Sequence, residues 1–320
     1  MSERFTSGIV AAPVTPFTSD AAVHWPTLDR YIAEVAAGRP SGIAVNMAAS
    51  EGGSLECGEQ LEVVSRAKRA ASGACPILSG VIASHTAGAR ETARRLEDAG
   101  ADGLVVFPPL PTFISKPLPV SAVVEFHAAI AEAVALPIVA FQTANVDYPP
   151  GTLAALAGID RLVAIKDAAF NVDRTAALLE EAEATAGKVS VLTGNDTFIL
   201  EALLMGCSGA LIGFAGTATA ELVRMYELAR ENQITEAYAI WRVLGPLARV
   251  CWRPPLRDYR VRMKYVLLRQ GVIPDMTARL PQPPISEPDR RDIDRVLERF
   301  GLLDRRYRPA APAARLRAAS

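Results

Sequence analysis

The sequence predicts an α/β fold, a (β/α)₈ TIM barrel with additional C-terminal helices, and three observations point to it. Short apolar runs of about five to seven residues alternate eight times with longer stretches of helical periodicity, rich in Ala, Leu, Glu and Arg. The runs are continuously apolar, which is typical of a parallel sheet buried on both faces. No Gly-x-Gly-x-x-Gly or Walker loop follows the first run, which disfavours the alternative, a doubly wound open sheet.

Each apolar run is expected to form one strand, and each stretch after it one crossover helix. The strands are predicted at Gly8–Val14, Gly42–Met47, Ile77–Ile82, Gly103–Phe107, Ile138–Gln142, Leu162–Lys166, Val189–Thr193 and Ala210–Phe214. The helices are predicted near residues 27–38, 57–72, 87–99, 120–134, 151–157, 173–184, 197–205 and 217–231. Eight such pairs in about 215 residues match the size of this barrel.

The chain stays helical after the eighth pair. Ile234–Val250 and Arg257–Gly271 are periodic and are separated by a break at Cys251–Pro255, and a last helix is expected at Glu287–Phe300 after a linker at Pro281–Ser286. Trp252 is expected to pack in this region, and Arg257, Arg260 and Arg262 to form a solvated or subunit-contact face. The expected divisions are a catalytic barrel at 1–231, a helical appendage at 232–302 and a flexible tail at 303–320.

Composition narrows the class of protein. The chain has 320 residues, and Lys plus Arg minus Asp plus Glu is 34 − 35 = −1, so no charge excess indicates nucleic acid or an anionic membrane as a partner. Four scattered cysteines without a Cys-x-x-Cys pair disfavour a zinc or disulfide scaffold, and the three histidines are too scattered for a metal site. No apolar run reaches about 18 residues and no signal-peptide pattern opens the chain, so we expect a cytoplasmic protein.

Lys166 is the first candidate for chemistry. It closes an apolar strand in the segment RLVAIKDAA, at the end of the barrel where active sites lie. Lysine is rarely buried without a partner, and desolvation lowers its pKa toward that of a nucleophilic amine that forms a Schiff base with a carbonyl carbon. The alternative is a strand-end lysine paired with Asp167 or a neighbouring carboxylate, and the residues alone favour neither interpretation.

The loop after the second strand, Met47–Leu55, is the second candidate. Its small residues allow backbone N–H groups to approach a carboxylate or phosphate closely. The alternative, an ordinary tight turn between a strand and a helix, is the better supported one on the loop sequence alone.

The chain resembles a known family, the dihydrodipicolinate synthase and N-acetylneuraminate lyase family of class I Schiff-base lyases. The resemblance covers about residues 6–300 and depends on the order and spacing of several motifs. These are Ala12–Phe17 (APVTPF), Met47–Leu55, Gly100–Pro109 (GADGLVVFPP), Leu136–Phe141 (LPIVAF), Val163–Ala169 (VAIKDAA) and Leu192–Asp196 (LTGND). It implies that Lys166 forms an imine with pyruvate or a related 2-oxo acid, without another cofactor or a metal.

The departures from the family pattern concern acid–base and carboxylate-binding groups. The family has Gly-Thr-Thr-Gly-Glu where this chain has Met47–Glu51, so both threonines are alanines. The strand-five tyrosine, the usual proton carrier, is Phe141, and a phenyl ring transfers no proton. The following stretch, Thr143–Asp147, lacks the arginine that binds a second carboxylate, and Pro109-Leu110 replaces a pair of tyrosines.

Substitute groups are therefore expected in the site. The resemblance places substrate contacts at Ala48, Ala49, Ser50, Phe141, Gln142 and Leu211. Candidate proton carriers are Ser50, Glu51, His85, Tyr148 or an ordered water; His85 is equally well interpreted as a residue that caps the following helix. Gln142 and Asn195 have amides that bind substrate oxygens or, equally, tie down neighbouring loops. Asp196 is expected to cap a helix.

These observations leave three hypotheses. The first is a Schiff-base lyase, an aldolase or dehydratase, acting on pyruvate or another 2-oxo acid. The second is 4-hydroxy-tetrahydrodipicolinate synthase proper, which the substitutions at Ala49 and Phe141 disfavour. The third is a catalytically degenerate barrel that binds a small 2-oxo acid. The resemblance also implies a homo-oligomer, a tetramer or a dimer.

Overall fold

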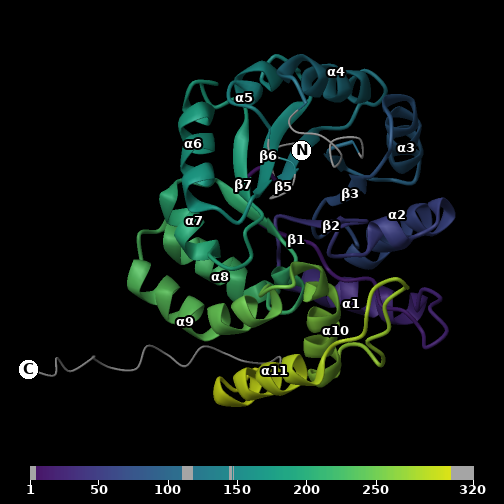
Figure 1. Cartoon of the computed structure of the whole chain (residues 1–320), viewed down its shortest axis with the longest axis vertical. Helices are drawn as coiled ribbons and strands as arrows, with labels where there is room; N and C mark the ends of the chain where they lie inside the picture. Colours follow the sequence, from purple (N-terminus) through teal and green to yellow (C-terminus); the bar gives the residue numbers. More distant parts are fainter. Residues whose placement is uncertain (1–4, 110–117, 144–145, 147, 304–320) are drawn as a thin grey trace, which may run out of the picture.

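The computed structural model, which describes residues 5–109, 118–143, 146 and 148–303, is a closed parallel barrel of eight strands in sequence order (Figure 1). Every neighbouring pair is parallel, and β8 pairs with β1 to close the barrel. The strands are β1 (Gly8–Ala11), β2 (Gly42–Val45), β3 (Ile77–Val81), β4 (Gly103–Val106), β5 (Ile138–Thr143), β6 (Leu162–Ala168), β7 (Ser190–Thr193) and β8 (Gly209–Ile212). The predicted fold class is confirmed.

Eight helices follow the strands and surround the barrel (Figure 1). They are α1 (Trp25–Ala37), α2 (Cys57–Ala71), α3 (Thr86–Asp98), α4 (Val120–Ala131), α5 (Thr152–Leu156), α6 (Val172–Glu183), α7 (Ile199–Met205) and α8 (Thr219–Arg230). Short 3₁₀ turns, η1 (Gly52–Ser54) and η3 (Phe214–Gly216), follow β2 and β8. All eight predicted strand–helix pairs are therefore present, with ends that differ by a few residues.

Two differences in strand length matter for the site. The first strand ends at Ala11 rather than Val14. The sixth strand continues two residues past Lys166, to Ala168, and pairs with β5 as far as Thr143. Because the side chains of a strand alternate between its two faces, the added length fixes on which face of β6 the residues before and after Lys166 lie.

Apolar side chains fill the space on both sides of the barrel wall. An inner cluster includes Val10, Leu78, Val139, Leu192 and Leu211, contributed by different strands and almost fully buried. A much larger outer layer packs the strands against the helices. The interior is thus a filled core, and polar chemistry is left to the end of the barrel at which the strands finish, its mouth.

The C-terminal segment adds α9 (Ile234–Cys251), the 3₁₀ turn η4 (Leu256–Asp258), α10 (Tyr259–Arg269) and α11 (Glu287–Arg299). Helix α9 packs against α8, and α11 packs against α9 and α10 (Figure 1). The expected boundary between barrel and appendage falls between α8 and α9. The expected tail, apart from Leu303, lies outside the described residues.

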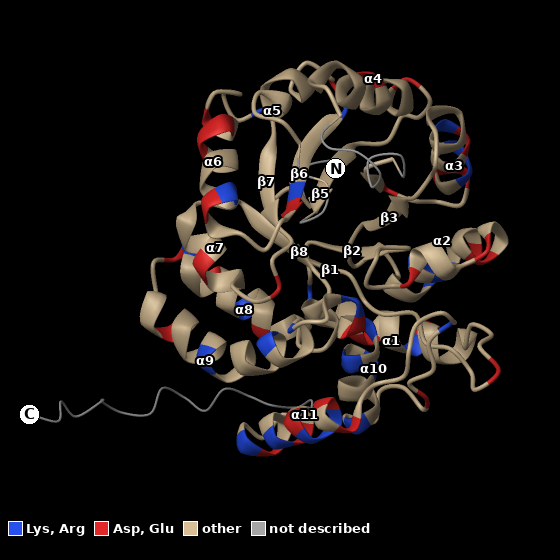
Figure 2. Ribbon diagram, viewed as in Figure 1, with Lys and Arg blue, Asp and Glu red and all other residues tan. Residues whose placement is uncertain are grey.

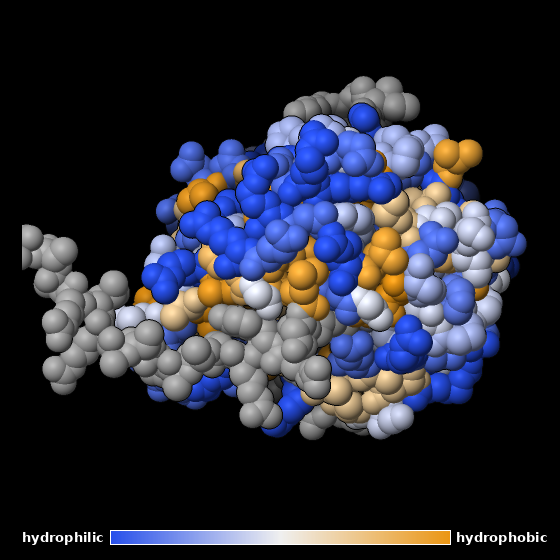
Figure 3. All heavy atoms as spheres, turned by 90° about the horizontal axis from the view of Figure 1, so that it is seen from below, coloured by the Kyte–Doolittle hydropathy of each residue, from blue (hydrophilic) through white to orange (hydrophobic). Residues whose placement is uncertain are grey.

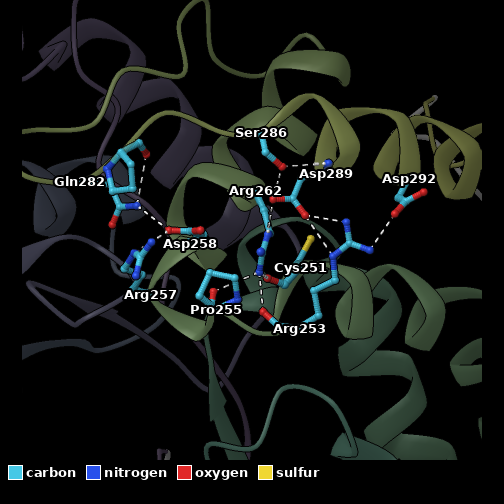
Figure 4. Close-up of polar contacts among 11 residues, drawn as sticks. Cys251, Arg253, Pro255, Arg257, Asp258, Arg262, Gln282, Ser286, Asp289 and Asp292 are labelled. Atoms are coloured by element: carbon cyan, nitrogen blue, oxygen red, sulfur yellow. Dashed lines mark hydrogen bonds and ion pairs between the residues drawn. The ribbon is translucent and has the colours of Figure 1, made fainter.

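A buried ionic cluster fixes the turn between α9 and α10 (Figure 4). Arg262 is 1% exposed, contacts Asp289 at 3.1 Å and donates to the carbonyl oxygens of Cys251 and Arg253. Arg253 in turn donates to Asp289 and, at 2.7 Å, to Asp292. The prediction of a solvated or subunit-contact face was therefore wrong for Arg262: its charge is used inside the chain, to join α10 to α11.

The outer surface carries charges of both signs on the helices (Figure 2). The face seen in Figure 3 is largely hydrophilic, with hydrophobic residues interspersed among hydrophilic ones. Among the described residues, no helix is both long and apolar enough to cross a membrane.

Candidate active site

Lys166 lies on the inner face of β6. The neighbouring inward residues, Ala164 and Ala168, belong to the inner cluster, so the two-residue period of the strand places Lys166 inside the barrel as well. The side chain is 8% exposed. Gly194 leaves room for it, because a Cβ at that position would lie 2.5 Å from the Lys166 Cε. A buried amine therefore reaches the mouth through a gap that glycine provides.

The Lys166 amine faces a small cavity of about 140 Å³. Its Nζ lies 4.3 Å from the centroid of the Phe141 ring, which comes from the paired position on β5. The described residues that line the cavity come from the strand ends and from the C-terminal helices. They are Ala49, Phe141, Thr143, Lys166, Ala168, Phe170, Gly194, Asp196, Gly213, Trp252, Leu256 and Tyr259.

Asp196 provides the carboxylate of this cavity. It follows β7, is 4% exposed, and its Oδ1 accepts a hydrogen bond from the Phe214 N–H at 2.7 Å. Burial raises the pKa of Asp196 and lowers the pKa of Lys166, while the attraction between the two charged forms opposes both shifts. The prediction that Asp196 caps α7 was wrong: Phe198 occupies the cap position, and the Asp196 carboxyl bonds to the Phe214 N–H instead.

Aromatic residues from the C-terminal helices form one wall of the cavity. The rings of Trp252 and Tyr259 are stacked with centroids 5.1 Å apart, and Trp252 also meets Phe214 edge to face. Burial raises the pKa of Tyr259, so its phenol stays neutral. Arg260 donates to the Ala48 carbonyl oxygen at 2.6 Å, which ties α10 to the loop after β2. The C-terminal segment therefore completes the site as well as extending the barrel.

The loop after β2 is held from several sides. The Ser50 hydroxyl donates to the Pro13 carbonyl at 2.7 Å, and Thr15 donates to the Ser50 carbonyl at the same distance. Glu51 is 4% exposed and forms an ion pair with Lys264, which also donates to the Thr277 carbonyl. Ala49 lines the cavity, whereas the Ser50 hydroxyl and the Glu51 carboxylate are engaged elsewhere in the described structure.

Asp167 lies on the opposite face of β6 and does not pair with Lys166. It is fully buried and accepts hydrogen bonds from the Gln142 amide, the Ala169 N–H, the Thr175 hydroxyl and the Asn195 amide, at 2.7–3.3 Å. The amide oxygens are also engaged: that of Gln142 accepts from the Tyr148 N–H, and that of Asn195 from the Phe170 N–H. Gln142 and Asn195 therefore join β5, β6, β7 and α6 on the outer side of the wall.

The other predicted residues lie away from the cavity. His85 is exposed at the start of α3, where its ring contacts the Ser84 hydroxyl and makes no capping hydrogen bond. Tyr148 is buried, and its hydroxyl donates to the Phe141 carbonyl at 3.0 Å. Leu211 is in the inner cluster. Leu110 and residues 144, 145 and 147 of the expected site lie outside the described residues.

Sequence reasoning missed the roles of Asp196, Trp252 and Tyr259. The signal for Asp196 was its position after an apolar strand, where polar residues of a barrel face the mouth. No local pattern indicates that the CWRPP break and the start of α10 return to the mouth. A larger hollow of about 660 Å³, lined by Trp241, Arg242, Arg249 and Phe300 among others, lies between α9 and α11 and does not include Lys166.

A closed (β/α)₈ barrel with a buried lysine and a carboxylate that line one cavity at the ends of its strands has the arrangement of an enzyme active site. A model of the Dihydrodipicolinate synthetase family matches residues 5–300. The chain therefore belongs to this family, whose members that resemble it are lyases.

Individual relatives agree with this assignment. A protein named 4-hydroxy-tetrahydrodipicolinate synthase from Pelodictyon phaeoclathratiforme is 30% identical over 95% of this chain and 100% of its own length. One named 4-hydroxy-tetrahydrodipicolinate synthase 1 from Halalkalibacterium halodurans is 27% identical over 89% and 94%. The solved dihydrodipicolinate synthase of Acinetobacter baumannii, described as complexed with pyruvate, is 26% identical with a TM-score of 0.83 over 93% and 99%.

Proposed function

We propose that the chain is a Schiff-base-forming lyase, an aldolase or dehydratase, that acts on pyruvate or another 2-oxo acid through Lys166. The observation that carries the proposal is the position of the Lys166 amine, which is buried, faces the cavity at the barrel mouth and has a pKa lowered by burial. A neutral amine in such a site attacks the carbonyl carbon of a 2-oxo acid. The resulting imine withdraws electrons from the adjacent carbon, so no separate cofactor is needed.

The loop after β2 supports the binding of the substrate carboxylate. The backbone N–H groups of Ala49 and Ser50 have no acceptor among the described residues, and Ala49 lines the cavity. Unpaired backbone N–H groups at a loop of small residues favour an anion. Both family threonines are absent here, so we propose that the backbone itself, at Ala48–Ser50, holds the carboxylate.

The second candidate is 4-hydroxy-tetrahydrodipicolinate synthase, which the names of the relatives favour. The cavity supports it less well. Lys166 is the one cationic side chain among the described residues that line the cavity, and an imine uses that amine. A second substrate with its own carboxylate would meet Asp196 and the aromatic wall of Trp252 and Tyr259 instead. We therefore propose an acceptor or leaving group that is uncharged at its far end.

We also propose a cytoplasmic homo-oligomer, a tetramer or a dimer, on the strength of the family.

Borohydride reduction in the presence of 2-oxo acids tests the proposal. Wild-type protein and Lys166→Ala would each be incubated with pyruvate and with longer 2-oxo acids, reduced, and measured by intact mass. We expect one stable adduct per chain in the wild type and none in Lys166→Ala. Absence of an adduct with every 2-oxo acid would contradict the proposal and favour a degenerate binding barrel, whereas efficient condensation of pyruvate with aspartate semialdehyde would establish the second candidate.

A further inference from the structure

The cavity lacks the family's strand-five tyrosine, yet imine chemistry requires a group that moves protons. Phe141 occupies that position, and its ring holds the Lys166 amine at 4.3 Å without an acidic hydrogen to give. The described residues that line the cavity include three ionisable side chains: Lys166 itself, Asp196 and Tyr259. Among these described residues, Asp196 and Tyr259 are therefore the two candidates for the proton carrier.

Asp196 is fixed in place and lines the same cavity as the Lys166 amine. The hydrogen bond from the Phe214 N–H to Oδ1 orients the carboxyl, and the side chain is 4% exposed. No ion pair within 4.0 Å joins Lys166 to Asp196 in the part of the chain described, although each charge shifts the titration of the other. The two groups therefore border one cavity without a direct ion pair between them.

Among the ionisable groups around the cavity, Asp196 is the one suited to exchange protons near neutral pH. The titratable side chains that act on it are Lys166 from β6, Tyr259 from α10 and Cys251 from α9. Burial raises the pKa of both Tyr259 and Cys251, so these two stay neutral. Burial also raises the pKa of Asp196 above the ordinary carboxyl range, so its acid and carboxylate forms are both available.

We propose that Asp196 is the acid–base residue of the Lys166 imine, in place of the strand-five tyrosine; this inference rests on the proposed function. The lone pair of neutral Lys166 Nζ forms a bond to C2 of the 2-oxo acid, the C2=O π electrons move to the oxygen, and one proton passes from the nitrogen to that oxygen, giving a carbinolamine. The C2–O bond then breaks, and the hydroxyl leaves as water with a proton from the Asp196 carboxylic acid. The products are a protonated imine and the Asp196 carboxylate.

The carboxylate then takes the proton needed for the next step. It removes a proton from C3, and the C3–H electrons form the enamine C=C bond while the C=N electrons return to nitrogen. The carboxylic acid formed in this way donates its proton to the oxygen of an aldehyde acceptor when C3 attacks the aldehyde carbon. Water then adds to C2 of the product imine, and the Asp196 carboxylate takes a proton from it, which restores the carboxylic acid and gives a second carbinolamine. The C2–N bond of this carbinolamine breaks, its hydroxyl proton passes to nitrogen, and the product leaves with a C2=O bond. Charge and protons then balance over the cycle.

A hydrogen-exchange experiment tests this inference and needs no aldehyde acceptor. The exchange of the pyruvate methyl protons for deuterium is followed by NMR in heavy water at saturating pyruvate. The rate would be compared in wild type, Asp196→Asn, Asp196→Glu, Tyr259→Phe and a control, Asp173→Asn, which changes an exposed carboxylate at the start of α6. Borohydride trapping on the same samples counts the imine. We expect exchange per imine to fall about a hundredfold or more in Asp196→Asn, to recover in part in Asp196→Glu, and to stay unchanged in Asp173→Asn.

Three results would overturn the assignment. Exchange per imine in Asp196→Asn within about threefold of the wild type would exclude Asp196, as would a larger loss in Tyr259→Phe. The wild type gives a third test that does not depend on how a variant folds: its exchange per imine is expected to rise with pH as the carboxyl ionises. A rate independent of pH between about 5 and about 8 would contradict the inference. Failure of the proposed function is distinct, because the wild type would then trap no imine at all.

Discussion

Lys166 and Asp167 are consecutive residues on β6 that face opposite sides of the barrel wall, and their surroundings differ sharply. Asp167 accepts four hydrogen bonds in a fully buried network on the outer side. Lys166 faces a cavity, a phenyl ring and a carboxyl that makes no direct ion pair with it among the described residues. The carboxylate, with its four hydrogen bonds, stabilises the wall, and the amine without an ion pair is the group that we propose to react.

Replacing the inner residue should abolish the chemistry and leave the fold intact. In Lys166→Met, we expect no trapping of a 2-oxo acid and a free energy of unfolding that is unchanged or about 1 kcal/mol higher, because a buried amine without a direct partner is costly. Intact mass after borohydride reduction and denaturant unfolding measure the two effects. Trapping that persists in this variant would mean that another amine reacts.

Replacing the outer residue should have the opposite effect. Asp167→Ala removes the one acceptor shared by two side-chain amides, a hydroxyl and a backbone N–H, so we expect a loss of about 3 kcal/mol or more in the free energy of unfolding. At a temperature where the variant is folded, the trapped fraction should stay close to that of the wild type. A stable Asp167→Ala variant that traps no imine would reverse the roles of the two faces.

A methyl group at Gly194 should act on Lys166 through space. The new Cβ would lie 2.5 Å from the Lys166 Cε and 3.0 Å from the Ala168 Cβ, so the lysine side chain must move. We expect Gly194→Ala to slow imine formation about tenfold to a hundredfold, since a displaced catalytic group is costly. Gly58→Ala is the matched control, because no atom lies within 4 Å of its added Cβ. Equal rates of imine formation in Gly194→Ala and Gly58→Ala would contradict the idea that the space at Gly194 positions Lys166.

The pH dependence of imine formation should show that Lys166 is buried. Burial lowers its pKa below the ordinary 10.5, and only the neutral amine attacks a carbonyl, so the second-order rate of imine formation should stop rising well below pH 10.5. If the Asp196 carboxylic acid expels the water, the rate should then fall as that carboxyl ionises. Stopped-flow trapping across this range measures the profile. A rate that keeps rising to pH 10.5 would indicate a solvated lysine.

The strands and the position of Lys166 could be predicted from the sequence. The eight apolar runs predict the strands because a strand that is buried on both faces must be continuously apolar. A lysine inside such a run stands out because burying its amine costs free energy, so a functional reason is expected. The period of two then separates Lys166 from Asp167 and Phe141 from Gln142 once the inner face is known. Gln142 was predicted either to bind substrate oxygens or to tie down neighbouring loops, and the same alternation places it on the outer face, where it bonds to Asp167 and Tyr148.

Other parts of the site depend on tertiary structure alone. Trp252 and Tyr259 reach the mouth because a buried cluster around Arg262 and Asp289 sets the turn between α9 and α10 (Figure 4). No local sequence pattern indicates that the residues of this turn lie at the barrel mouth. Asp196 had an ambiguous signal, since an aspartate before a helix is more often a cap.

Peptide mapping after reduction with isotopically labelled pyruvate tests the central claim most directly. The chain has five lysines, Lys68, Lys116, Lys166, Lys188 and Lys264, so the labelled peptide identifies the amine that forms the imine. We predict that the label is found on Lys166 alone, with one label per chain. A label on any other lysine, or an unlabelled protein at saturating 2-oxo acid, would contradict the account of the inner face as the site of chemistry.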